Sequence, residues 1–157
     1  MKIKLLAIGR TDDKNLQVLI ATYEKRLKHY IKFESEFIPD IKNVKNLSKK
    51  EQKEKEGELI LKKISPTDQI IILDEKGKEF SSVEFSKFLQ KKMNSGIKQL
   101  VLVIGGPYGF SEKVYQKALG KISLSKMTFS HQMIRLFVVE QIYRAFTILK
   151  NEPYHHE

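Results

Sequence analysis

The sequence has no cysteine. A disulfide framework, a zinc site built from thiolates and a cysteine nucleophile are therefore excluded, and the composition suits the reducing cytoplasm, where we expect the protein to be located. Long hydrophobic runs are also missing, since no stretch approaches the ~20 apolar residues that span a bilayer. The start of the chain, Met1–Ile8, is interrupted by Gly9 and Arg10 too early for a signal peptide. We therefore expect no membrane partner.

The chain also lacks internal repeats, low-complexity tracts and any linker rich in Pro, Gly or Ser, with only 4 prolines and 8 glycines among its 157 residues. That length is typical of one domain, and it allows roughly 70% of the unfolded surface to be buried without a disulfide or a structural metal. We therefore interpret residues 1–157 as a single domain.

Acidic residues are in the minority: 29 Lys and Arg against 19 Asp and Glu give a net charge of +10. The excess is concentrated in residues 41–64, which contain eight lysines and four glutamates. A basic surface attracts polyanions, and nucleic acid is the commonest of them. The same excess is found in soluble proteins of organisms whose proteins are generally rich in lysine. Charge therefore indicates a class of partner and leaves the activity open.

Hydrophobic patterning predicts strands that alternate with helices along the whole chain. Capping boxes at Ser48–Glu51 and Ser81–Glu84 mark the starts of two helices. The expected strands are 2–9, 33–38 (near a sheet edge, because Pro39 follows), 69–74, 100–104 and 122–124; the expected helices are 13–29, 48–64, 81–93, a short one after Ser111, and 131–150. This alternation predicts an α/β fold with a mainly parallel sheet covered by helices on both faces.

The last predicted helix, 131–150, has two apolar stripes, one through Ile134 and Val138 and another through Met133 and Leu136. A helix that is apolar on more than one side is expected to be buried on more than one side. In so small a domain another subunit can supply the second surface. We therefore expect a two-fold homodimer through this helix.

Several common site motifs are missing. The first predicted strand ends in the single Gly9, so no dinucleotide fingerprint follows it, and no Lys-Ser or Lys-Thr pair follows a glycine loop. A Gly-x-Ser-x-Gly elbow is absent as well, and the four histidines lack metal-ligand spacing with carboxylates, so we expect no metal. One feature remains, the glycine-rich segment Gly105–Gly109 after the strand 100–104. In parallel sheets ligands bind at that edge, where glycines allow close approach; the alternative is a tight turn without a ligand.

The C-terminal third resembles a known family. The run Leu124–Arg135 continues through Val139–Ala145 to Pro153-Tyr154-His155, and Ile104-Gly105-Gly106-Pro107-Tyr108-Gly109 precedes it. Together these segments resemble the ribosomal large subunit pseudouridine methyltransferase H family of the SPOUT class. Shorter segments of the N-terminal half share the likeness, at 23–27, 55–57 and 73–78. The resemblance covers essentially the whole chain and implies no additional RNA-binding domain.

The resemblance implies a SPOUT fold in which the C-terminal segment forms a trefoil knot, a topology otherwise very rare. It also implies that S-adenosyl-L-methionine (SAM) binds in that knot, in a bent conformation, at the interface of a homodimer. The implied cofactor-binding residues are Leu73, Gly105, Leu124, Ser125, Lys126, Met127, Thr128 and Phe129. Alternatively, Ser125, Thr128 and Ser130 are turn or cap residues, and Met127 and Phe129 are core residues.

The activity implied by the resemblance is methylation of N3 of a pseudouridine in 23S rRNA of the assembled ribosome. That nitrogen must lose its proton, so a fixed cation and a base are required. We expect Arg144 to stabilise the base anion and His155, or a water that it holds, to take the proton; the catalytic set also includes Glu140 and Tyr154. Alternatively, Glu140 and Arg144 form a surface ion pair and His155-His156 belong to a frayed tail.

Two positions depart from the family pattern. Ser130 stands where many relatives have proline, and His156 stands where relatives often have arginine or lysine. The first change is expected to loosen the cofactor loop and the second to weaken a phosphate contact. Two other functions remain open at this point: a non-catalytic basic protein that binds RNA or the ribosome, and a flavodoxin-like enzyme, which predicts a monomer with affinity for phosphate ligands.

Overall fold

The computed structural model describes residues 1–42 and 44–156, and strands and helices alternate in it as the patterning predicts. The strands are β1 (Lys2–Ile8), β2 (Lys32–Ile38), β3 (Gln69–Glu79), β4 (Gln99–Ile104) and β5 (Gly120–Ser123). The helices are α1 (Lys14–Leu27), α2 (Lys49–Lys62), α3 (Ser82–Asn94), α4 (Glu112–Lys117) and α5 (His131–Leu149), with a short 3₁₀ turn at Val44–Asn46. Both predicted capping boxes are confirmed, at Ser48 with Glu51 and at Ser81 with Glu84.

The five strands form one sheet in the order β2-β1-β4-β3-β5, and every neighbouring pair is parallel. The strand before Pro39, β2, lies at an edge, as predicted. Strand β4 lies in the middle and is buried from Leu100 to Ile104, because a parallel strand covered on both faces is apolar throughout.

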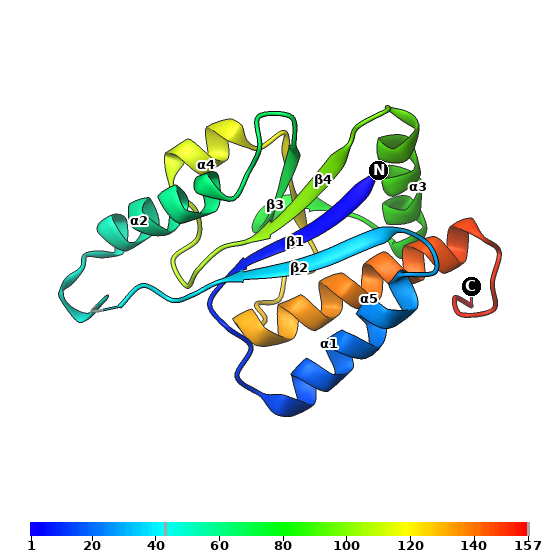
Figure 1. Cartoon of the computed structure of the whole chain (residues 1–157), viewed down its shortest axis with the longest axis horizontal. Coiled ribbons are helices and arrows are strands. Elements are labelled where there is room, and N and C mark those ends of the chain that lie inside the picture. The colour runs from blue at the N-terminus through cyan, green and yellow to red at the C-terminus, as the bar shows by residue number, and fades with distance from the viewer. Residues whose placement is uncertain (43, 157) are drawn as a thin grey trace.

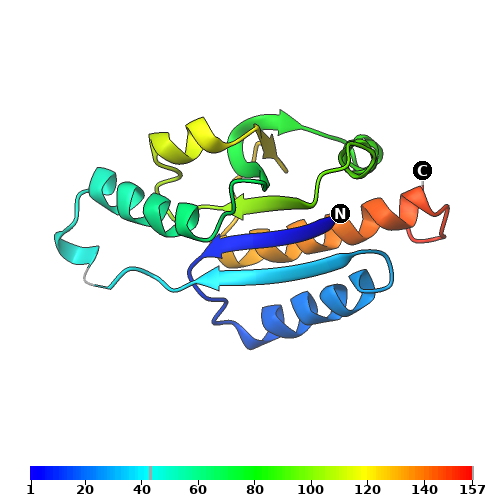
Figure 2. The ribbon, with the colours of Figure 1, turned by 45° about the horizontal axis from the view of Figure 1, so that its top comes forward.

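Helices cover both faces of the sheet (Figures 1 and 2). On one face the core joins α1, α3 and α5 to the strands, through residues such as Leu27, Leu89 and Ile142. On the other face a smaller core joins α2 and α4, through Ile60 and Val114. The predicted α/β fold class is therefore confirmed. The trefoil knot stays a prediction.

Strand β3 is longer than the predicted segment 69–74. After Leu73 the pairing with β5 shifts register and resumes at Lys78, so that the strand continues to Glu79. Gly77 makes this possible, because a Cβ atom at this position would lie 2.4 Å from the backbone carbon of Ile122. The periodicity of the sequence does not show such a close approach of two backbones.

Helix α5 packs between α1 and α3 and buries Val138, Val139 and Ile142. Phe137 stays exposed, and Met133 and Leu136 are half-buried, so part of the second apolar stripe lies at the surface. Within the described residues no helix is long and apolar enough to cross a membrane.

Gly57 of α2 is expected to be required for the packing of α2 against α4. Alanine is the better helix former by about 1 kcal/mol, yet a Cβ atom here would lie 2.2 Å from Oγ of the buried Ser111. Overpacking of this kind typically costs about 1–3 kcal/mol. Gly57→Ala is therefore predicted to lower the free energy of unfolding by about 1 kcal/mol net, which denaturant titration would measure.

The double variant Gly57→Ala/Ser111→Gly removes the overlapping atoms and is expected to recover most of that loss relative to Ser111→Gly alone. If Gly57→Ala instead stabilises the protein, α2 and α4 are not packed as described.

Candidate active site

A cavity of about 320 Å³ opens at the carboxyl end of β4, where the pairing of β3 with β4 ends. Its walls are the last β3–β4 pair, Leu73 and Ile104, together with the loop 105–110 and the segment 122–131. Of the predicted cofactor-binding residues, the structure brings together Leu73, Gly105, Leu124, Ser125, Met127, Thr128 and Phe129 around this cavity, whereas Lys126 is not among the lining residues. Their role in binding a cofactor stays a prediction.

The glycine loop, Gly105–Gly109, forms a tight turn that continues β4 into the cavity wall. A backbone bridge joins Gly106 to Gly109, the N–H of Gly109 donates to the carbonyl oxygen of Gly106 at 3.1 Å, and Gly109 has φ +80°. Positive φ is a conformation that glycine adopts without strain. The prediction of a tight turn and the prediction of a ligand wall are therefore compatible.

The glycine loop rests on a buried carboxyl group that the sequence analysis did not identify. Glu56 of α2 is 3% exposed, and a Cβ atom at Gly106 would lie 2.2 Å from its Oε2. Its Oε1 accepts a hydrogen bond from Gln52, and Oε2 has no protein partner within the described residues. Burial raises the pKa of Glu56, and the nearby charge of Asp40 also raises it. The one sequence signal for Glu56 was its position in the segment Lys55–Gly57, which shares the family resemblance.

The segment 124–130 forms the opposite wall and is shaped by its own serines. Ser125 Oγ accepts from the N–H of Met127 at 2.9 Å, and Ser130 caps α5 by accepting from the N–H of Met133. The turn and cap interpretation of these two serines is confirmed. Met127 is 76% exposed, so its interpretation as a core residue is wrong. Phe129 is also exposed and contacts the ring of Phe137.

Two carboxylates at the cavity, Asp74 and Glu75, were also missed. Asp74 accepts hydrogen bonds from the Tyr115 hydroxyl at 2.5 Å and from the N–H of Lys76 at 2.7 Å. Burial and the bond to Asp74 raise the pKa of Tyr115 to about 12, so this hydroxyl remains a donor at neutral pH. The apolar walls with an acidic border favour a ligand that combines an apolar ring with positive charge.

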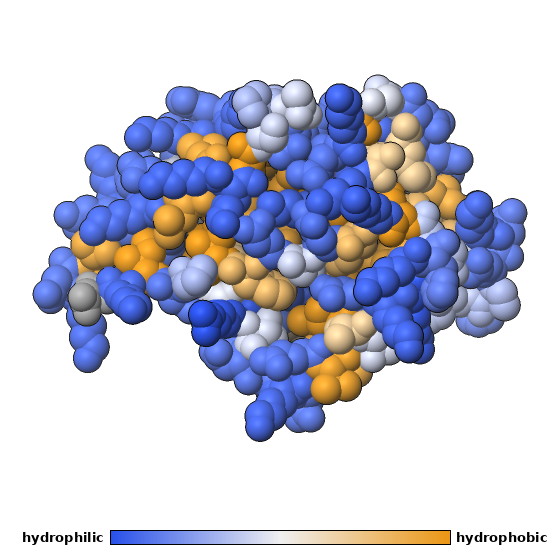
Figure 3. Space-filling view, viewed as in Figure 1, coloured by the Kyte–Doolittle hydropathy of each residue, from blue (hydrophilic) through white to orange (hydrophobic). Residues whose placement is uncertain are grey.

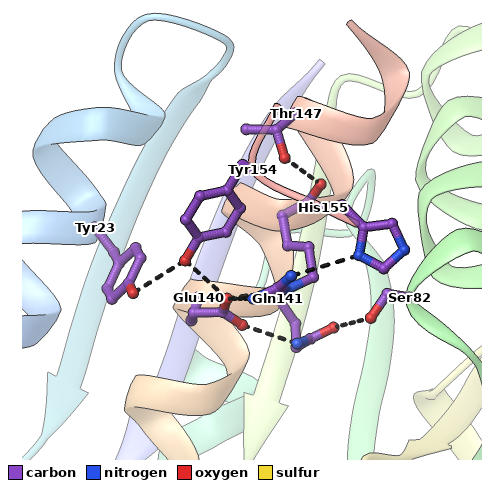
Figure 4. A network of polar contacts seen from close by, with 8 residues as sticks. Tyr23, Ser82, Glu140, Gln141, Thr147, Tyr154 and His155 are labelled. Carbon is purple, nitrogen blue, oxygen red and sulfur yellow. Dashed lines mark hydrogen bonds and ion pairs between the residues drawn. The ribbon is translucent and has the colours of Figure 1, made fainter. Parts of the chain in front are cut away.

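The four predicted catalytic residues lie together at the far end of α5 (Figure 4). Glu140 Oε1 accepts from Nη2 of Arg144 at 2.7 Å and from Nε at 3.1 Å, and it also accepts from the Tyr154 hydroxyl at 3.0 Å. Nη1 of Arg144 lies 3.4 Å from Nδ1 of His155. Glu140 raises the pKa of Arg144, which therefore stays charged.

This network is more than a surface ion pair. The Arg144 and Glu140 side chains are only 26% and 15% exposed. The network continues through Gln141, which donates to Glu140 and accepts from Ser82 of α3, and through Tyr154, which shares a 3.1 Å hydrogen bond with Tyr23 of α1 (Figure 4). The i,i+4 ion pair is therefore confirmed, but it is partly buried and belongs to a larger network that connects α5 to both of its helical neighbours.

The segment that follows α5 is held against the helices rather than frayed. The Tyr154 ring packs edge-on against Tyr143, and Arg144 lies over its face at 4.7 Å. Glu152 accepts from the Tyr30 hydroxyl. The frayed-tail interpretation is therefore wrong for His155, while His156 is exposed. Burial and the bonds to Tyr23 and Glu140 raise the pKa of Tyr154, so it acts as a donor and not as a base at neutral pH.

The cavity and the catalytic cluster lie at different positions along α5. Ile134 lines the cavity, and the helix rises about 15 Å from there to Arg144. The first turn of α5 is fixed by Arg135, which is 1% exposed and donates to Thr11 Oγ1 and to the Ile8 carbonyl. One rigid helix therefore carries both groups of residues, and neither Glu140 nor Arg144 lines this cavity.

The buried carboxyl of Glu56 predicts a pH-dependent stability. Its pKa is higher in the folded chain than in the unfolded one, so the folded state binds more protons between those two values. Stability should therefore fall as pH rises through that window and stay reduced above it. Glu56→Gln keeps the shape without the charge, and its Tm is expected to exceed that of the unmodified chain at pH 8.

That difference in Tm should shrink toward zero as the pH approaches 4, where the glutamate itself is neutral in the folded chain. Thermal unfolding across pH 4–8 measures both limits, with Glu58→Gln on the exposed side of α2 as the control. An unchanged difference across this range would contradict the assignment of the charge as its cause.

Comparison with known proteins identifies the family. A family model described as "Predicted SPOUT methyltransferase" matches residues 1–155. Proteins named "Ribosomal RNA large subunit methyltransferase H" are 74% identical in Flavobacterium psychrophilum, 73% in Flavobacterium johnsoniae and 66% in Parabacteroides distasonis, each over 157 residues that cover all of both chains. The resemblance seen in the sequence is confirmed, and the chain belongs to the SPOUT methyltransferase family.

Proposed function

We propose that this chain transfers a methyl group from SAM to N3 of a pseudouridine in 23S rRNA of the assembled ribosome, in the cytoplasm. The observation that carries the proposal is the convergence of two separate segments, the glycine loop and 124–129, on one cavity at the strand ends. Relatives that match along the full length are named as methyltransferases of large-subunit rRNA.

The cavity suits SAM in size and chemistry. Its volume of about 320 Å³ is within the range of small-molecule sites. Leu73, Leu124 and Ile134 offer apolar surface to an adenine ring, and the glycine loop offers its backbone for hydrogen bonds. Asp74 and Glu75 suit the positive charges of the ligand. SAM supplies the methyl group on a sulfonium that is already a good leaving group, so the protein chiefly has to orient the acceptor.

The catalytic cluster suits the acceptor. N3 of a pseudouridine carries a proton between two carbonyl groups, and its removal leaves an anion spread over the neighbouring oxygens. Arg144 is charged, fixed by Glu140 and able to stabilise that anion. His155 stands beside it and takes the proton directly or through water. Glu140 and Tyr154 position the guanidinium rather than react.

The separation of about 15 Å along α5 favours a site built from two subunits. Arg144 is folded back onto Glu140 and does not reach the cavity of its own chain. In an antiparallel two-fold dimer the far end of one α5 approaches the cavity of the other chain. The exposed Phe137 and the half-buried Met133 and Leu136 supply apolar surface for such an interface. The proposal therefore includes a homodimer with two shared active sites.

The rRNA is held by surface charge. A dimer carries twice the charge of one chain, 2 × 10 = +20. The lysines of α2 and the preceding segment are candidate phosphate contacts, which position the RNA without reading its sequence. Binding is therefore expected to weaken steeply as salt increases.

A mixing experiment tests the shared site. Arg144→Ala is predicted to retain SAM binding and to lose at least about a hundredfold in kcat, because a fixed charge no longer stabilises the anion. Thr128→Trp fills the cavity from its exposed segment and is predicted to abolish SAM binding. The substrate is ribosomes from cells without this gene. Co-expression of the two inactive chains should methylate them at about a quarter of the normal rate, because half of the dimers are mixed and each mixed dimer has one complete site out of two.

Activity in the mixed sample no higher than in either variant alone would show that the cluster does not serve the partner's cavity. Undiminished turnover by Arg144→Ala would overturn its catalytic role. Calorimetry with SAM on each variant homodimer is the control. If the unmodified chain binds no SAM, the methyltransferase proposal fails and a basic RNA-binding protein remains.

A further inference from the structure

Tyr108 at the tip of the glycine loop has no role in the site described above. Its neighbours Gly106, Pro107 and Gly109 line the cavity, whereas Tyr108 does not, so the ring lies outside the cavity wall. The residue is 44% exposed. Within the described part of the chain the ring has no aromatic neighbour and its hydroxyl has no side-chain partner, in contrast to Tyr115, which packs on Phe110 and donates to Asp74.

The backbone that carries Tyr108 is held in place, although the side chain itself is exposed. The bridge between Gly106 and Gly109 closes the turn on which it stands. The backbone of Gly106 lies against the buried carboxyl of Glu56, so the turn is packed directly on α2. An exposed aromatic ring on a fixed backbone loses little conformational entropy when a ligand covers it.

The surroundings of Tyr108 are basic. Nζ of Lys49, in the first turn of α2, lies 5.5 Å from the centre of the ring. Four more exposed lysines lie nearby in the sequence, before and within α2: Lys42, Lys45, Lys50 and Lys55. None of these five belongs to an ion pair in the part of the chain that the structure describes. In Figure 3 hydrophilic residues cover most of the end of the molecule at which α2 lies, on the left of the view, with hydrophobic ones between them.

We propose that Tyr108 and Lys49 form a stacking site for an unpaired nucleobase of the substrate RNA, adjacent to the nucleotide that is methylated. The inference rests on the proposed function, since it requires RNA at the mouth of the cavity. The base stacks on the face of the tyrosine ring that Lys49 does not cover, and the lysine ammonium contacts the phosphate of the same strand. The glycine loop then has two roles: its backbone lines the cofactor cavity, and the side chain at its tip contacts the RNA.

The chemistry of the reaction explains the need for such a site. An enzyme that modifies a base has to take it out of the stack, which exposes the face of the neighbouring base to water. An aromatic side chain beside the cavity replaces the lost stacking, and it does so for any base because every base has a π-face. Lysines that follow the backbone add affinity that depends on salt.

Steady-state methylation of ribosomes from cells lacking this gene, with each variant of the full dimer, separates the two contributions. Tyr108→Ala is expected to raise the KM for ribosomes about tenfold, and Tyr108→Phe to change it by less than about twofold, since stacking needs the ring and not the hydroxyl. The plot of log(kcat/KM) against log[salt] has a negative slope. Lys49→Gln should make that slope less steep by about one, whereas Tyr108→Ala should leave it unchanged.

Lys87→Gln, on α3 at the opposite face of the sheet, is the matched control and is expected to change neither quantity. Calorimetry should find the same Kd for SAM in the Tyr108 variants as in the unmodified chain. An unchanged KM in Tyr108→Ala overturns the inference, and so does a loss of SAM affinity that accounts for the rise in KM. If the unmodified chain methylates no ribosome, the proposed function fails first; if it does and Tyr108→Ala matches it, only this inference fails.

Discussion

The glycine loop after β4 is the constraint on which the rest of the structure depends. Its backbone lies against the buried Glu56 carboxyl on one side and against Phe110 on the other. A side chain at Gly106 would overlap the Glu56 carboxyl, and one at Gly105 would be in tight contact with the ring of Phe110. The central strand β4 and these two contacts therefore fix the position of the loop. The same few backbone atoms position the cavity wall, the packing on α2 and the exposed tip of the loop. This packing buries the carboxyl group of Glu56 and raises its pKa, which disfavours its charged form.

A second rigid element, α5, sets the distance between the cavity and the cluster of Glu140 and Arg144. Arg135 and Ser130 fix its start at the cavity, and Glu140 with Arg144 connects its far end to α1 and α3. Because the rise of a helix is fixed, Ile134 at the cavity and Arg144 stay about 15 Å apart along α5. We propose that dimerisation completes the active site by bringing the cavity of one chain beside the Arg144 cluster of the other.

Local patterns were enough to predict most of the fold, because strand alternation and the capping boxes at Ser48 and Ser81 depend on residues close in sequence. The family resemblance likewise predicted which loop residues surround the cavity, except for Lys126, which does not line it. Contacts between distant segments were not predictable: the carboxyl of Glu56 under Gly106, the continuation of β3 past Gly77 and the position of Asp74 at the cavity each depend on tertiary packing. The same reason explains why the exposure of Met127 differs from its hydrophobic character.

The central claim is that the glycine loop and the segment 124–129 together form the site for the methyl donor. A crystal structure of the dimer soaked with SAM tests this most directly. We expect adenosine between Leu73, Leu124 and the backbone of Gly105, with the partner's Arg144 near the methyl group. Electron density that shows the cavity closed by the chain's own side chains, with SAM absent or bound elsewhere, would contradict it.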